Sequence, residues 1–159
     1  MYIASSNRLD RLKPRSAAPF RAFMQHRALL ASRSIPVGPM LYYFGSRHRY
    51  EEYLYGEEIE AYLLDGVITH TGLAFSRDER HKVYIQHKMK DDAEILAGML
   101  GTSGAMRGAF YLCGPTWPVP DVFEAIVGAL VKYDGMERQA AEEYIEGLKE
   151  EERYVLEVY

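Results

Sequence analysis

Short apolar runs alternate with segments of helical periodicity along most of this sequence, and that alternation limits the folds open to the chain. The runs at 40–46, 67–76, 108–114 and 153–159 have the length and composition of strands. Strands separated by helix-length segments need crossover connections, and such connections build parallel sheets that are covered by helices on both faces. The sequence therefore predicts an α/β fold with a parallel sheet.

The spacing of apolar residues also predicts where the covering helices lie. A helix over 50–66 is expected to stop at Gly66, and a helix over 84–100 is expected to break near Asp91. The full set of expected helices is 18–33, 50–66, 84–100, 120–133 and 136–151.

Composition excludes several classes of function. The chain has 159 residues, enough for one domain with a real core, and its net charge of −4 argues against a nucleic-acid partner. One cysteine cannot form an internal disulfide, and no Cys/His cluster has zinc spacing, so no metal is predicted. No run reaches the roughly 18 apolar residues of a membrane span. We expect a cytoplasmic protein.

Polar clusters follow three of the predicted strands, at "FGSR" (44–47), "FSRDERHKVYIQ" (75–86) and "CGPTWPVPD" (113–121). The carboxyl ends of parallel strands share one sheet edge, and ligands bind there in open α/β sheets. In the second cluster a hydroxyl, a guanidinium and an ammonium suit a phosphate, and a tyrosine can stack on an adenine ring. By composition alone, ordinary solvated loops are the favoured interpretation of the first two clusters.

The third cluster places the only cysteine, Cys113, at a strand end before a stiff loop. Gly114 permits a sharp turn, and the three prolines within 115–120 fix backbone angles. Asp121 then stands where a helix cap or a first-turn acid is favoured. Two interpretations of Cys113 remain open: a small buried residue at a strand end, or a thiol held against a ligand.

Four motifs in the same order along the chain resemble the NADP-binding half of the ferredoxin–NADP reductase superfamily. They are "FGSRHRYEEYLYGEE", "AFSRDERHKVYIQHKM", "FYLCGPTWPVPDV" and the terminal "RYVLEVY". The resemblance covers roughly 18–159 and is strongest to the diflavin reductases, of the sulfite reductase flavoprotein and cytochrome P450 reductase type. It implies a Rossmann-like parallel sheet and an oxidoreductase that transfers hydride from NADPH to FAD. Four ordered motifs favour this over solvated loops.

The resemblance also implies roles for individual residues. Cys113 and Glu157 correspond to the catalytic positions beside the nicotinamide, and Tyr159 corresponds to the terminal aromatic residue that covers the FAD ring. Ser76, Arg77 and Lys82 correspond to residues that hold the 2′-phosphate of NADP. The whole set implied to bind NADP(H) is Arg47, Ser76, Arg77, Lys82, Val83, Tyr84, Ile85, Gln86 and Asp121.

The beginning of the chain departs from the family pattern. Residues 14–17 lack the glycines of the family's phosphate loop, so residues 1–17 are interpreted as a remnant of a degraded first strand and that loop, ahead of an NADP-binding domain at 18–159. The FAD- and FMN-binding domains have no counterpart, so a flavin domain or subunit is expected as partner. The alternative is a truncated or degenerate non-catalytic paralogue that keeps the fold and binds a nucleotide or a partner.

Overall fold

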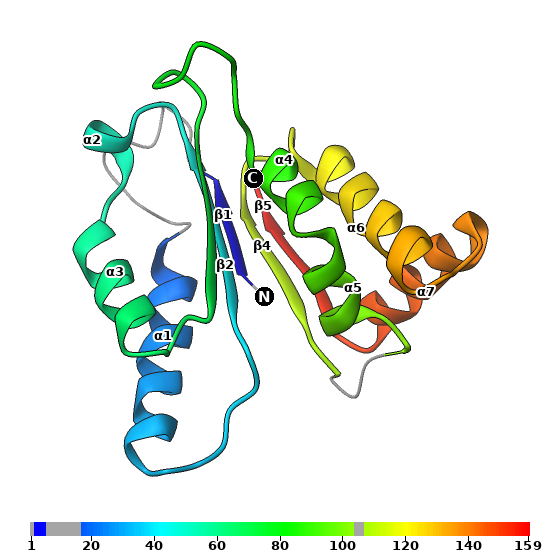
Figure 1. Cartoon of the computed structure of the whole chain (residues 1–159), viewed down its shortest axis with the longest axis horizontal. Helices are drawn as coiled ribbons and strands as arrows, with labels where there is room; N and C mark the ends of the chain where they lie inside the picture. Colours follow the sequence, from blue (N-terminus) through cyan, green and yellow to red (C-terminus); the bar gives the residue numbers. More distant parts are fainter. Residues whose placement is uncertain (1, 6–16, 104–106) are drawn as a thin grey trace.

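The structure, a computed structural model, describes residues 2–5, 17–103 and 107–159 (Figure 1). Its strands form one sheet in the order β3-β2-β1-β4-β5, and all neighbours run parallel. This confirms the predicted α/β fold with a parallel sheet. The strands are β1 (Tyr2–Ser5), β2 (Leu41–Ser46), β3 (His70–Phe75), β4 (Phe110–Gly114) and β5 (Tyr154–Val158).

Helices cover both faces of this sheet (Figure 1). Helices α1 to α3 lie against one face and α4 to α7 against the other, because the chain changes sides when it passes from β3 at one edge to β4. The helices are α1 (Ala17–Ser32), α2 (Arg49–Glu52), α3 (Gly56–Leu64), α4 (Ile85–Asp91), α5 (Ala93–Leu100), α6 (Val119–Tyr133) and α7 (Arg138–Glu150). Within the described ranges, no helix has the length and apolar character needed to cross a membrane.

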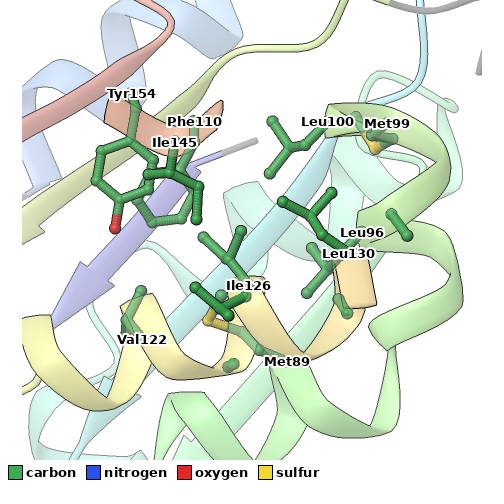
Figure 2. Packing of buried hydrophobic residues seen from close by; sticks show 14 of the residues in the cluster. Met89, Leu96, Met99, Leu100, Phe110, Val122, Ile126, Leu130, Ile145 and Tyr154 are labelled. Carbon is green, nitrogen blue, oxygen red and sulfur yellow. The ribbon is translucent and has the colours of Figure 1, made fainter. Parts of the chain in front are cut away.

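Two hydrophobic clusters hold these layers together. Side chains alternate between the faces of each strand, so Tyr43 belongs to the cluster beneath α4 to α7, whereas Tyr42 and Phe44 belong to the cluster beneath α1 and α3. Figure 2 shows the larger cluster, in which α6 side chains such as Ile126 and Leu130 lie among residues of α4, α5 and the sheet. Because α6 packs against β4 in this cluster, the packing holds the carboxyl end of β4 in place.

The prediction of one helix over 50–66 is wrong, because two helices, α2 and α3, replace it. Between them Tyr55 has a left-handed backbone, with φ of 65°. The ring of Tyr53 packs against Phe44 and Phe75, with centroids 5.2 and 5.6 Å apart, so the residue between the two helices is anchored to the sheet. The predicted stop holds, since α3 ends at Leu64.

The predicted break near Asp91 is confirmed, and Asp92 explains what the break does. Its Oδ2 atom accepts a hydrogen bond of 2.8 Å from the hydroxyl of Tyr43 and lies 2.7 Å from Nε2 of His70. Burial, reinforced by Asp92, raises the pKa of the fully buried Tyr43 far above its usual value. The junction between α4 and α5 is thereby tied to both β2 and β3.

The first strand lies in the middle of the sheet, although only four residues build it. Strand β1 pairs with β2 on one side and with β4 on the other, so that Ala4 stands opposite both Phe44 and Cys113. The proposed phosphate-loop remnant at Pro14, Arg15 and Ser16 lies outside the described residues.

Candidate functional site

A pocket of about 270 Å³ opens at the carboxyl ends of β2 and β3. Its walls come from the end of β2, the loop that joins β3 to α4, and the loop after β4. In Figure 1 the loop between β3 and α4 stands at the top of the view, at the edge where the parallel strands end. The lining residues are Gly45, Ser46, Arg47, Ala74, Ser76, Arg77, Lys82, Val83, Tyr84, Ile85 and Trp117.

Backbone hydrogen bonds join the two loops that form one wall of the pocket. The amide of Ser76 donates to the carbonyl of Ser46, and the amide of Arg77 donates to the carbonyl of Arg47, both at 3.0 Å. Pairing therefore continues beyond the ends of β2 and β3. It places the side chains of these loops at fixed positions around the pocket.

Asp78 holds the same two loops together from outside the pocket. Its carboxylate accepts a hydrogen bond of 2.7 Å from the amide of Arg49 and lies 2.8 Å from Nδ1 of His48. The hydrogen bond from the Arg49 amide, and then the contact with the His48 imidazole, lower the pKa of Asp78 below its usual value. The loop after β3 is thus anchored to the start of α2.

The pocket is strongly cationic. Arg47, Arg77 and Lys82 line it, and none of the described residues that line it is acidic. Arg77 and Lys82 are exposed, and their side chains form no ion pair within the described part of the chain. Guanidinium and ammonium groups in one concavity are suited to an anion that carries several acceptor oxygens.

The floor of the pocket adds an unpaired hydroxyl and a close backbone approach. Ser46 is 7% exposed, and its Oγ has no hydrogen-bond partner among the described residues. At Gly45, an added Cβ would lie 2.7 Å from Cγ2 of Ile85, so glycine keeps this floor open beside α4. A buried hydroxyl of this kind needs a partner, and a polar ligand in the pocket can provide one.

Gln86 and Asp121 meet next to the pocket and do not line it. The Nε2 atom of Gln86 donates a hydrogen bond of 3.0 Å to Oδ2 of Asp121, which joins the first turn of α4 to the first turn of α6. Gln86 is buried, and its Oε1 has no partner among the described residues. This pair positions the two helices whose beginnings flank the pocket.

The remaining predicted residues gather two strands away, at the ends of β4 and β5. Cys113 stands opposite Glu157 in the strand register, and the amide of Tyr159 donates a hydrogen bond of 3.1 Å to the carbonyl of Gly114. Cys113 is buried against the α1 side of the sheet, Glu157 is exposed, and Tyr159 is 49% exposed. With β1 between β2 and β4, roughly 10 Å separates these strand ends.

Trp117 is a lining residue to which the sequence motifs assign no role. It follows Gly114, whose φ of 146° is a conformation that favours glycine, and it lies between the buried Pro115 and Pro118. Trp117 is the only tryptophan and is 49% exposed. A single large aromatic residue inside a proline-rich loop is the sequence signal that could have identified it.

Across the described ranges, no group of three or more His, Cys, Asp or Glu side chains is arranged to hold a metal ion. The lining of the candidate site instead consists mainly of cations, hydroxyls, aromatic rings and apolar side chains. Together these features describe a site for an anionic ligand with a planar ring.

Comparison with known proteins places the chain beside NADPH-dependent flavoprotein reductases. No protein-family model matches the chain. Curated homologues nevertheless include sulfite reductase flavoprotein components and cytochrome P450 reductases, which confirms this part of the resemblance that the motifs indicate.

The similarity to individual proteins extends over most of this chain. The sulfite reductase [NADPH] flavoprotein component of Saccharomyces cerevisiae is 46% identical over 146 residues, covering 89% of this chain and 14% of that protein. A probable counterpart in Schizosaccharomyces pombe is 44% identical, with the same coverage. The NADPH–cytochrome P450 reductase of Rattus norvegicus is 37% identical over 143 residues and is covered to 21%. The chain thus spans only a small part of these relatives.

Proposed function

We propose that this chain is an NADP(H)-binding module of a diflavin-type reductase and positions NADPH for hydride transfer to FAD. One observation carries the proposal: seven of the nine residues that the family resemblance assigns to NADP(H) line one cationic pocket at the carboxyl edge of the sheet. These seven are Arg47, Ser76, Arg77, Lys82, Val83, Tyr84 and Ile85.

The strand order supports a Rossmann-like interpretation of the fold. Dinucleotide-binding sheets with the order 3-2-1-4-5 hold their ligand where the order reverses, next to the first strand. Here that point lies between β1 and β4, with the cationic pocket on one side and Cys113 on the other. A dinucleotide laid across this edge would reach from one group of residues to the other.

The donor set of the pocket fits the 2′-phosphate that distinguishes NADP from NAD. Ser76, Arg77 and Lys82 supply a hydroxyl, a planar guanidinium and a mobile ammonium, and the buried Oγ of Ser46 still needs a partner. Tyr84 lies in the same pocket and would mark the adenine side. These residues would hold the phosphate and leave the dinucleotide to extend towards β4.

At the other end of the ligand, Cys113 and Glu157 would flank the reacting ring. When bound, NADPH would supply the hydride that FAD accepts. The thiol of Cys113 is held at a buried strand end, and the carboxylate of Glu157 on the neighbouring strand is exposed. The reaction also needs bound FAD, which we expect a flavin-binding domain or subunit to supply.

Cofactor titration of the purified chain tests the proposed function. NADPH should bind about ten- to a hundredfold more tightly than NADH, because a charge-assisted contact to the 2′-phosphate contributes about 1.5–3 kcal/mol. Calorimetric titration of both cofactors measures this ratio, and raising the salt concentration should reduce it. Equal affinities would contradict the phosphate role, and binding of neither cofactor would leave the non-catalytic alternative.

A second prediction concerns Tyr159, which we propose contacts FAD. Tyr159→Ala should lower the free energy of unfolding by about 1 kcal/mol or less, because the side chain is half exposed. The matched control is Tyr154→Ala, which removes a 3% exposed ring stacked on Phe110 and should cost about 3–5 kcal/mol. Denaturant unfolding of both variants measures the difference.

The flavin role of Tyr159 needs a separate measurement. When Tyr159→Ala is joined to a matching FAD-binding domain, the nicotinamide should bind more tightly against the flavin and leave more slowly, because the ring no longer covers the FAD. Stopped-flow absorbance follows this release. A large loss of stability in the isolated chain, with unchanged nicotinamide release, would make Tyr159 a packing residue.

A further inference from the structure

We infer that Trp117 supplies the stacking face for the planar base of the nucleotide, and that Tyr84 holds the indole in place; this inference rests on the proposed function. Trp117 lines the cationic pocket from the loop after β4, whereas Arg77 and Lys82 line it from the loop after β3. An aromatic face beside cations matches a ligand that carries a base and a phosphate on one sugar. The motifs assign Trp117 no role.

The geometry of the two rings decides how a base can bind. The ring centroids of Tyr84 and Trp117 lie 5.5 Å apart, and their planes are inclined by 72°. A base sandwiched between two rings needs parallel faces about 7 Å apart, which is twice the van der Waals spacing of stacked atoms. The two rings therefore form a corner, in which a base stacks on one face and meets the other ring at its edge.

Of the two rings, Trp117 has the more open face. Tyr84 is half-buried and has the ring of His87 as a second neighbour, at 5.8 Å. Trp117 is 49% exposed, and Tyr84 is its only ring contact within the described residues. A large indole left half in water on a structured loop gains from a flat ligand that covers it.

The loop around Trp117 is built to hold this ring still. Pro115 and Pro118 on either side are buried, and α6 begins directly after them. The hydrogen bond between Gln86 and Asp121 joins the first turn of α6 to the first turn of α4. Helix α4 begins directly after Tyr84. The corner is thus fixed before a ligand arrives, which reduces the entropy lost on binding.

Adenosine 2′,5′-bisphosphate is the probe for this inference, because it carries both the base and the 2′-phosphate. Its binding should quench the fluorescence of Trp117, the only tryptophan, and Trp117→Ala should weaken its affinity by about five- to fiftyfold. Trp117→Phe keeps an aromatic face and should stay within about threefold of the original affinity. Calorimetry gives the affinities of the variants.

Two controls separate stacking from general damage. Inorganic phosphate, measured as a competitor, lacks a base, so Trp117→Ala should change its affinity by less than about twofold. Tyr133→Ala removes another exposed aromatic ring, at the far end of the 15-residue α6, and should leave every affinity unchanged. The positioning role of Tyr84 has its own test. Tyr84→Ala should weaken the affinity for the bisphosphate, and Tyr84→Phe should retain the original affinity.

The outcomes distinguish this inference from the proposed function. The bisphosphate and NADPH can both bind while Trp117→Ala leaves their affinities unchanged, still higher than the affinity for inorganic phosphate. In that case the stacking role is overturned and the NADP(H) site stands. If the bisphosphate binds with quenching while NADPH shows no preference over NADH, the base platform stands and the proposed function fails. If the bisphosphate does not bind at all, both are overturned.

Discussion

Arg77→Ala should weaken NADPH binding by about ten- to a hundredfold and leave NADH binding within about twofold. Arg77 is exposed at the pocket, and its guanidinium forms no ion pair with another described residue, so its charge is available to a ligand. If Arg77 holds the 2′-phosphate, as we propose, its removal deletes a charge-assisted contact that only NADP can make. Calorimetric titration of both cofactors against the variant measures the effect.

The matched control for this variant is Arg80→Ala. Arg80 is an exposed arginine in the same loop that does not line the pocket, so its removal changes net charge equally without touching the site. It should shift both cofactor affinities only slightly, and less so at high salt. If Arg77→Ala reduced both affinities alike, or if Arg80→Ala matched its effect, the 2′-phosphate would not be held by Arg77.

Phe110→Ala should lower the free energy of unfolding by about 3–5 kcal/mol, the range for a large aromatic truncated in a packed core. Phe110 begins β4, is 0% exposed and stacks on Tyr154 with ring centroids 4.6 Å apart. Figure 2 shows the two rings side by side, next to Ile145. Their stacking joins β4 to β5, so its loss affects the strand that carries Cys113.

Denaturant unfolding measures this loss, and Phe23→Ala is the control. Phe23 lies on α1 and is 38% exposed, so the same truncation there leaves a smaller cavity and should cost about 1 kcal/mol. If Phe110→Ala also cost only about 1 kcal/mol, the core around Phe110 would relax around the cavity. In that case the cluster beneath α6 would not be the main source of stability.

Local pattern was sufficient for most of the elements. Side-chain alternation and helical spacing depend only on near neighbours along the chain, which is why β2, β4, α6 and the break beside Asp92 could be predicted. The run from Ser76 to Ile85 supplies six of the pocket's lining residues from one continuous stretch, so its clustering was also visible in the sequence.

The helix over 50–66 fails for the opposite reason. Its local pattern is helical, but burying Tyr53 against Phe44 and Phe75 forces the chain out of the helix before Gly56. That burial depends on two strands that are distant in sequence. Tertiary packing therefore overrides the local helical preference, as tertiary context often does.

The parallel α/β pattern and the cationic loop after β3 could be predicted from the sequence, because both arise from residues close together in the chain. The central position of the four-residue β1 in the sheet, and the contact between Trp117 and Tyr84 in the same pocket, are seen only in the folded chain. Strand order and loop contacts depend on which apolar faces can be buried together. That choice is made by the whole chain, so no local stretch encodes it.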